Sequence, residues 1–344
     1  MTSPSPLAPR PWPAVQRILV IGLSNIGDAV LMSPVIQTLS EQYPEAELTL
    51  LVGERARVVF DGDPRVHHLV TADRFEGVLG RLQQIAWLRR AHPDVLVDLR
   101  HTALPLLWRP WRAWRYFRPL PSSIVHMRDR HLWRLRMQDP QAINGAERAP
   151  SLWIAPEDQA HAERLLKRWS VEASKPLVII CVGARSHTKR WYAARFAQVA
   201  DRLIAEQGVE VVLTGEPDEA PIVHEVLGAM QQRAHSAASL TTLRQLAALM
   251  ERAALVLTND SASLHVAGAI GAPVIALFGP TDARKYGPTG AAGRVIRRRL
   301  FCAPCEQAQC RFSHECMRFI SVDEVVQAAS AMLEQGNSLR DAGS

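Results

Sequence analysis

The sequence predicts an α/β protein made of two doubly wound domains that face each other across a cleft. Three observations predict it. Short apolar segments rich in β-branched residues alternate with longer segments of helical periodicity, and this alternation runs through the chain twice. A proline-containing stretch near residues 139–156 separates the two runs. The length of 344 residues also suits two domains of ordinary size.

The first run begins with a strand at residues 18–21 and a helix at residues 29–39. Further strands are predicted at residues 48–52, 68–71 and 94–99, with a second helix at residues 80–91. Because helices separate most of these strands, we expect a parallel sheet with right-handed crossovers.

The second run repeats the plan. Its predicted strands cover residues 177–181, 209–213, 255–258 and 274–278, and its predicted helices cover residues 156–169, 192–207, 242–252, 263–270 and 322–335. We therefore expect a disordered leader at residues 1–16, an N-terminal domain at residues 17–150 and a C-terminal domain at residues 151–344. Doubly wound sheets bind ligands outside the carboxyl ends of their strands, so the cleft is the expected site.

The composition is that of a globular protein, with 47% hydrophobic and 22% charged residues, which excludes a disordered chain. The first 16 residues contain five prolines and no apolar core, so they do not resemble a signal peptide. No apolar run approaches the ~20 residues of a membrane helix. We expect a cytoplasmic protein whose five cysteines are thiols or metal ligands.

The positive charge is concentrated in one segment. The chain has a net charge of +6, and residues 104–136 alone carry eight arginines against one aspartate. The same segment holds four of the nine tryptophans. Arginine and tryptophan together suit the surface of an anionic membrane. Packing inside the N-terminal domain and nucleic-acid binding are the alternatives, and no nucleic-acid-binding motif accompanies the segment.

The turn after the first strand is the first candidate site. It contains Ser24, Asn25, Gly27 and Asp28 just before the first helix. Glycine allows a close backbone approach, and the helix N-terminus offers free N–H groups to an anion or an acceptor hydroxyl. Asp28 is either a functional carboxylate or an ordinary acidic residue in the first helical turn.

A second candidate lies where two later strands end. Asp260, Ser261, Ser263 and His265 follow one strand and open a helix, and Gly279 and Thr281 follow the next. Two such strand exits side by side favour a phosphate-binding cradle. Helix capping and a buried histidine are the alternative.

Two further loops follow strands and carry charged residues that could bind a ligand in the same cleft. The segment 183–191 carries Arg185 and Lys189, either of which could neutralise a diphosphate; the alternative is a solvated basic loop. Glu216 follows another strand and could bind ribose hydroxyls or cap the next helix.

Four cysteines lie within 15 residues, at Cys302, Cys305, Cys310 and Cys316. This spacing, with its leading CxxC, resembles a structural zinc site. An iron–sulfur cluster or a group of buried or redox-labile thiols is the alternative.

Taken together, the motifs resemble glycosyltransferase family 9, the ADP-heptose:lipopolysaccharide heptosyltransferases. The resemblance lies in SNIGDAVLMSPVIQTL (residues 24–39), GARSHTKRWYAARFAQVADRL (183–203) and LTNDSASLHVAGAIGAPVIALFGPTD (257–282). It implies a GT-B fold of two Rossmann-like domains, with the acceptor on the N-terminal domain and the nucleotide-sugar on the C-terminal one. The cysteine-rich segment 302–316 also resembles a feature of many members.

The resemblance also implies roles for individual residues. Asp28 matches the family's general base, and Lys189 matches a lysine that contacts the donor phosphates. Asp260, Ser261 and His265 match the segment at the donor diphosphate. Ser24, Asn25 and Gly27 then lie on the acceptor side, and we place Arg109, Arg112 and Arg115 there as contacts to an anionic acceptor.

The function that the resemblance implies is inverting transfer of heptose from ADP-heptose to the inner core of lipopolysaccharide. No cofactor is expected in catalysis, although a structural zinc remains open. The expected partners are the nucleotide-sugar, the lipid-anchored acceptor and the cytoplasmic surface of the inner membrane, with no nucleic acid. The alternatives are a family member with another sugar or glycan acceptor, and a non-catalytic protein that binds lipopolysaccharide or nucleic acid.

Overall fold

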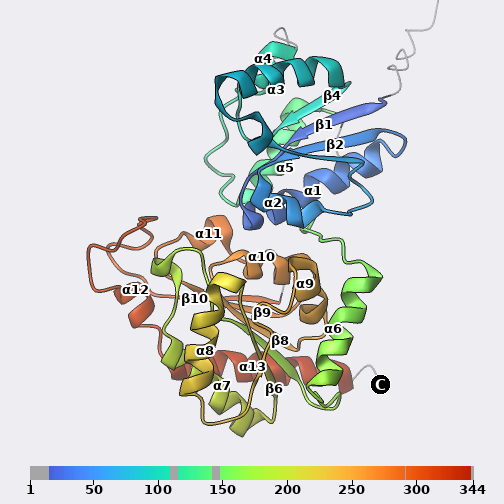
Figure 1. Cartoon of the computed structure of the whole chain (residues 1–344). Coiled ribbons are helices and arrows are strands. Elements are labelled where there is room, and N and C mark those ends of the chain that lie inside the picture. The colour runs from blue at the N-terminus through green and yellow to red at the C-terminus, as the bar shows by residue number, and fades with distance from the viewer. Residues whose placement is uncertain (1–14, 109–114, 142–147, 291, 342–344) are drawn as a thin grey trace, which may run out of the picture.

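The computed structural model describes residues 15–108, 115–141, 148–290 and 292–341, the last five of these by backbone alone. It contains two parallel sheets, one in each half of the chain, and Figure 1 shows them as two bodies stacked one above the other. This confirms the predicted α/β class. The leader predicted at residues 1–16 falls almost entirely outside the described residues, and the boundary at residue 150 stays a prediction.

The N-terminal sheet has four strands in the order β3-β2-β1-β4, and every pair is parallel. Its strands are β1 (Arg17–Ile21), β2 (Glu47–Val52), β3 (His68–Thr71) and β4 (Val95–Asp98). Its helices are α1 (Ile26–Gln42), α2 (Glu54–Phe60), α3 (Gly77–Ala91), α4 (Leu104–Trp108) and α5 (Met127–Gln138), with a 3₁₀ turn η1 (Ala72–Phe75). The chain reverses its direction of winding between β1 and β4, so the turn after β1 lies at the point where doubly wound folds bind ligands.

The C-terminal sheet has six parallel strands in the order β10-β9-β8-β5-β6-β7. The strands are β5 (Leu177–Cys181), β6 (Glu210–Thr214), β7 (His235–Ser236), β8 (Leu255–Asn259), β9 (Val274–Phe278) and β10 (Gly293–Arg297). The helices are α6 (Pro156–Arg168), α7 (Ala193–Gln207), α8 (Ala220–Ala229), α9 (Leu243–Glu251), α10 (Ala262–Ala269), α11 (Ala283–Tyr286), α12 (Glu315–Arg318) and α13 (Val322–Asp341), with 3₁₀ turns η3 (His187–Lys189) and η4 (Pro217–Glu219). Here the winding reverses between β5 and β8, whose loops carry the predicted donor residues Arg185, Lys189, Asp260 and Ser261, while Glu216 follows β6 and Gly279 and Thr281 follow β9.

Helix α1 is buried along most of its length and forms part of the interface between the two domains. Pro34 lacks an N–H, which leaves the carbonyl of Val30 free, and the Ser33 hydroxyl donates to that carbonyl at 2.7 Å. The helix therefore continues through its proline. It packs against α10 of the other domain, and the buried apolar side chains of both domains form one continuous cluster.

The arginine-rich helix α5 packs inside the N-terminal domain, which for this part of the segment 104–136 favours the alternative of internal packing over the predicted membrane surface. Leu132 and Leu135 are buried, and α5 packs against α1 and β4. The Arg134 guanidinium donates to the carbonyl of Leu99, and Arg128 pairs with its neighbour Asp129 at 2.7 Å. Within the part of the segment that is described, Trp133 is also half-buried.

Candidate active site between the two domains

A cavity of about 1290 Å³ lies between the domains. The turn after β1 lines it from the N-terminal domain, and the loops after β5, β6, β8 and β9 line it from the C-terminal domain. The cavity is therefore the cleft that the sequence predicted, at the carboxyl ends of strands from both sheets. Most of the predicted site residues line it: Asn25, Gly27, Asp28, Arg185, Lys189, Glu216, Asp260, Ser261, Ser263, His265 and Thr281.

Asp28 is the acidic group on the N-terminal side of the cavity. It lies in the first turn of α1 and is half-buried. Burial raises the pKa of Asp28, while a hydrogen bond from Asn25 and the positive charge of Lys189 oppose that rise. The donor is Asn25 Nδ2, 3.2 Å from Asp28 Oδ2. A carboxylate with a raised pKa in a cleft is suited to accept a proton.

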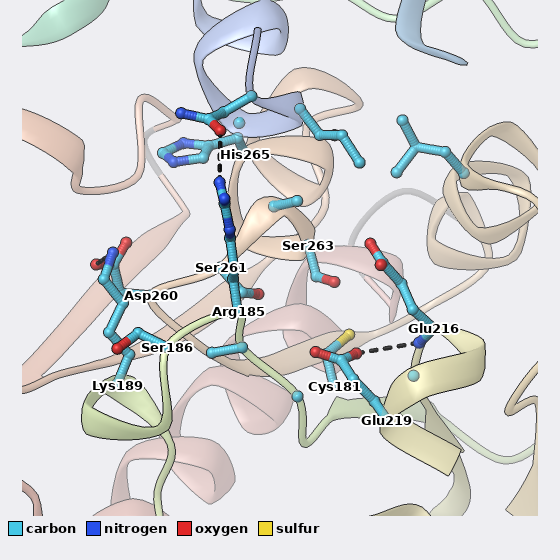
Figure 2. A pocket seen from close by; sticks show the side chains of 18 of the residues that line it. Cys181, Arg185, Ser186, Lys189, Glu216, Glu219, Asp260, Ser261, Ser263 and His265 are labelled. Atoms are coloured by element: carbon cyan, nitrogen blue, oxygen red, sulfur yellow. Dashed lines mark hydrogen bonds and ion pairs between the residues drawn. The ribbon is translucent and has the colours of Figure 1, made fainter. Parts of the chain in front are cut away.

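Lys189 lies on the C-terminal side of the cavity, opposite Asp28. Its Nζ lies 2.7 Å from Oδ2 of Asp260, which is buried at the end of β8. The ion pair fixes the lysine at the edge of the cavity, as Figure 2 shows, with a third of its side chain still exposed. A cation held in this way can also bind the anionic part of a ligand.

The backbone that carries Lys189 is held by Asn259, which the sequence analysis did not single out. The fully buried Asn259 accepts a hydrogen bond at its Oδ1 from the backbone N–H of Trp191 at 3.0 Å. Its Nδ2 donates to the carbonyls of Val182 and Gly183 at 2.9 and 3.2 Å. Asn259 thus links both ends of the 183–191 loop to the end of β8. Its position directly before Asp260 was the only sequence signal for it.

Helix α10 directs its N-terminus into the cavity, with Ser261 as the residue before its first turn. Its free N–H groups and the Ser261 and Ser263 side chains line the cavity beside Lys189. The next turn places His265 against the N-terminal domain. Burial lowers the pKa of His265 to about 4, so this imidazole is neutral near pH 7.

Arg185 crosses from one domain to the other. Its Nη1 donates to Asn25 Oδ1 at 2.8 Å, the dashed line above Arg185 in Figure 2. Asn25 in turn donates to Asp28. The loop that lines the donor side is therefore connected to the candidate base by two hydrogen bonds.

Two acidic residues line the far part of the cavity. The backbone N–H of Glu216 donates to Glu219 Oε2 at 3.0 Å, the dashed line beside Glu219 in Figure 2. The Glu219 carboxylate lies against the backbone of Gly183. A Cβ at Gly183 would lie 1.9 Å from that carboxyl carbon, so a side chain there would displace the Glu219 carboxylate from this position. Glu219 was missed because its functional neighbour, Gly183, is distant in sequence. Burial raises its pKa.

Several predicted residues lie elsewhere. Ser24 packs against Gly53 and does not line the cavity. Gly279 is buried against Met317 and Cys316 instead of facing a ligand, whereas the neighbouring Thr281 does line the cavity. Arg115 is half-buried and its charge acts on Asp139. Arg109 and Arg112 lie outside the described residues.

The four cysteines do not form the metal site that their spacing suggested. They line one small cavity together with His314, but Cys305 and Cys310 are exposed while Cys316 is buried. In the described part of the chain, no three His, Cys, Asp or Glu side chains are close enough to hold a metal ion. Burial, with the neighbouring thiols, raises the pKa of Cys316 to about 11. The donor set does not fit zinc in this geometry.

Two Rossmann-like domains that face each other across a cleft are the arrangement of the GT-B glycosyltransferases. The model of glycosyltransferase family 9 (heptosyltransferase) matches residues 124–315. The chain belongs to this family and is a glycosyltransferase. Lipopolysaccharide heptosyltransferase 2 of Escherichia coli K12 is 28% identical over 306 residues, covering 82% of this chain and 88% of that relative. An Escherichia coli lipopolysaccharide heptosyltransferase 3 is 28% identical over 283 residues, covering 74% and 81%.

Solved structures share the fold along nearly the whole chain. A family 9 glycosyltransferase from Veillonella parvula has a TM-score of 0.78 at 24% identity and covers 93% of this chain and 98% of its own. An ADP-heptose lipopolysaccharide heptosyltransferase II from Escherichia coli has a TM-score of 0.72 at 23% identity, with 94% and 100% covered. The GT-B prediction is thereby confirmed.

Proposed function

We propose that this protein transfers heptose from ADP-heptose to a hydroxyl of the lipopolysaccharide inner core with inversion at the anomeric carbon. The observation that carries the proposal is the placement of Asp28 opposite Lys189, with the N-terminus of α10 beside the lysine. A base and a diphosphate site on opposite sides of one cavity are what a direct displacement at a sugar carbon requires. The lipopolysaccharide heptosyltransferases among the relatives support the choice of sugar and acceptor.

In this mechanism the acceptor hydroxyl attacks the anomeric carbon while Asp28 takes its proton. General-base assistance contributes a factor of ~10²–10⁴ to the rate. The bond to the diphosphate breaks on the opposite face, and negative charge grows on the leaving oxygen. Lys189 and the N–H groups of α10 stabilise that charge because they are already in place before reaction.

The nucleotide part of the donor would occupy the C-terminal side of the cavity. Glu216 and Glu219 present carboxylates near the ends of β5 and β6, where ribose hydroxyls can donate to them. Thr281 has a buried hydroxyl without a hydrogen-bond partner in the described structure, and it lines the same cavity. We assign this hydroxyl to the donor.

Lys189 supplies the positive charge that a divalent metal provides in other glycosyltransferases, so we propose metal-independent chemistry. We also propose that the protein works at the cytoplasmic surface of the inner membrane, where its lipid-anchored acceptor is made. No helix in the described part of the chain has the length and apolar character needed to cross a membrane.

The test is incubation of the purified protein with ADP-heptose and defined core acceptors, followed by mass spectrometry. The expected product carries one added heptose, and Asp28→Asn forms none. UDP-glucose and ADP-glucose in parallel reactions identify a member that uses another sugar. If the wild type transferred no heptose but did transfer a sugar from UDP-glucose or ADP-glucose, the proposed donor would be overturned.

A further inference from the structure

Helix α3 presents its apolar residues to solvent. Val78, Leu79 and Leu82 share one face of the helix and are 79%, 75% and 59% exposed. Its buried side is narrow and consists of Gly80 and Leu88. A surface helix of a globular protein ordinarily has the opposite arrangement, with its apolar face on the core.

Neighbouring elements extend this surface. Leu106 and Leu107 on α4 are 44% and 42% exposed, and Phe117 is 48% exposed. Of the thirteen large apolar side chains that are exposed in the described part of the chain, six thus lie between residues 78 and 117. Scattered exposed apolar residues are normal, but such a concentration marks an interaction site.

One small core holds these residues together. Leu88 of α3, Leu104 of α4 and Tyr116 are buried in a single cluster with Phe75, and α4 packs against α3. Figure 1 shows the two helices side by side at the end of the N-terminal domain that is remote from the C-terminal domain. The exposed residues therefore form one supported patch, the α3–α4 apolar surface: Val78, Leu79, Leu82, Leu106, Leu107 and Phe117.

The charges on helix α3 itself favour one kind of partner, although the exposed Glu76 lies at its N-terminus. Helix α3 carries Arg81, Arg89 and Arg90, all exposed, and has no acidic residue. A second copy of this chain docked symmetrically here would bring these arginines close to their own counterparts. A bilayer with anionic headgroups instead offers an apolar interior to the leucines and negative charge to the arginines.

We propose that the α3–α4 apolar surface docks on an anionic lipid bilayer and brings the cleft to a membrane-anchored acceptor. The proposal rests on the proposed function for its purpose, and it names the contact surface. It moves the membrane contact from α5, whose Arg128 and Arg134 bind within the domain, to α3 and α4. The segment 117–126 continues from this surface to His126, whose Nε2 donates to the carbonyl of Gly287 in the other domain at 3.1 Å.

The experiment is co-sedimentation of the full chain with vesicles of phosphatidylethanolamine and phosphatidylglycerol, and with vesicles of phosphatidylcholine alone. We expect the wild type to bind the anionic vesicles and to be released by salt. The variant Leu79→Ser/Leu82→Ser should bind them ~10-fold more weakly, because two apolar side chains no longer enter the bilayer. Its melting temperature should stay at the wild-type value, since both residues are exposed. The variant Arg81→Gln/Arg89→Gln/Arg90→Gln should lose the preference for anionic lipid.

The matched control is Leu240→Ser/Phe319→Ser, which removes two exposed apolar side chains on the C-terminal domain, 41% and 49% exposed. It should bind vesicles like the wild type. Equal binding by the α3 variant and the control, or no binding by the wild type at low salt, would overturn the proposal. So would a wild-type dimer, seen by sedimentation velocity, that Leu79→Ser/Leu82→Ser dissociates.

Activity separates this proposal from the proposed function. The α3 variant should transfer sugar to a soluble, delipidated acceptor at the wild-type rate and to a vesicle-embedded acceptor more slowly. Failure of heptose transfer to both acceptors by the wild type would overturn the proposed function, while the vesicle measurements would still decide the docking surface.

Discussion

Arg185 of the C-terminal domain donates a hydrogen bond to Oδ1 of Asn25 in the N-terminal domain, across the cavity that separates them. Because the amide oxygen of Asn25 faces the guanidinium, its nitrogen faces Asp28. The contact between the domains and the orientation of the candidate base are thus set by the same side chain.

The first prediction concerns Asn25. In Asn25→Ala, Asp28 loses the hydrogen bond that opposes the effect of burial, so its pKa should rise. A base must be deprotonated to act, and the acidic limb of the kcat profile should therefore move to higher pH. Arg185→Ala should move the limb in the same direction and by less. An unchanged limb in Asn25→Ala would contradict this role for Asn25.

Asp28→Asn tests the base itself. We expect kcat to fall by ~10²–10⁴ because the amide cannot accept the proton. The affinity for ADP, the nucleotide part of the donor, should stay close to that of the wild type when measured by calorimetry, since the diphosphate site lies on the other domain. A folded variant with near-normal kcat would show that Asp28 has only a structural role in the first turn of α1.

For Lys189→Ala, both donor binding and kcat should decline. We expect a loss of ~10²–10³ in kcat, because charge on the leaving diphosphate is no longer stabilised. Loss of the partner of the buried Asp260 should also lower the melting temperature. Lys175→Ala, which removes an exposed lysine paired with Glu172, is the matched control and should change none of these quantities.

Chelation should leave both kcat and the melting temperature unchanged. The cation of the proposed site is Lys189, and among the described residues no three of the thiols of the 302–316 segment are close enough together to hold a metal ion. Atomic absorption on the purified protein, with kcat measured before and after EDTA, tests this. Loss of activity that Mg²⁺ or Mn²⁺ restores would contradict the metal-independent mechanism.

A last prediction concerns stability in acid. Burial lowers the pKa of His131 to about 3, and neither ring nitrogen has a hydrogen-bond partner in the described structure. The unfolded state binds a proton near pH 6.5 that the folded state excludes. Stability is therefore complete above that pH and declines as the pH falls from about 6.5 towards 3. In His131→Phe the free energy of unfolding in urea should decline less between pH 8 and pH 5. An equal decline in both proteins would exclude this role for His131.

The strands and the phosphate-side loops were predictable because their signals are local. The predicted strand at residues 274–278 coincides with β9, and Asp260 and Ser261 follow β8 as expected. Helix α5 was missed because its arginines mask the apolar periodicity. Leu132 and Leu135 give it one buried side, and Arg134 and Gln138 bind backbone groups near the end of β4.

The rest of the site depends on contacts between residues that are distant in sequence. Nothing near Glu219 indicates that its carboxylate lies against Gly183, and nothing near Arg185 indicates Asn25. Ser24 and Gly279 show the reverse error. Each lies in a motif at a strand exit, but the backbone directs one towards Gly53 and packs the other against Met317.

Gly27 packs directly against His265 where the two domains meet. A Cβ on Gly27 would lie 2.6 Å from Cδ2 of the buried imidazole, so the backbone of α1 rests directly on the ring. Any side chain at this position would act as a wedge and move Asp28 away from the donor side without altering a reacting group. The distance between Asp28 and the donor side of the cleft therefore depends on a residue that has no side chain. Substitution at Gly27 would be a starting point for redesigning the cleft to take longer or shorter acceptors.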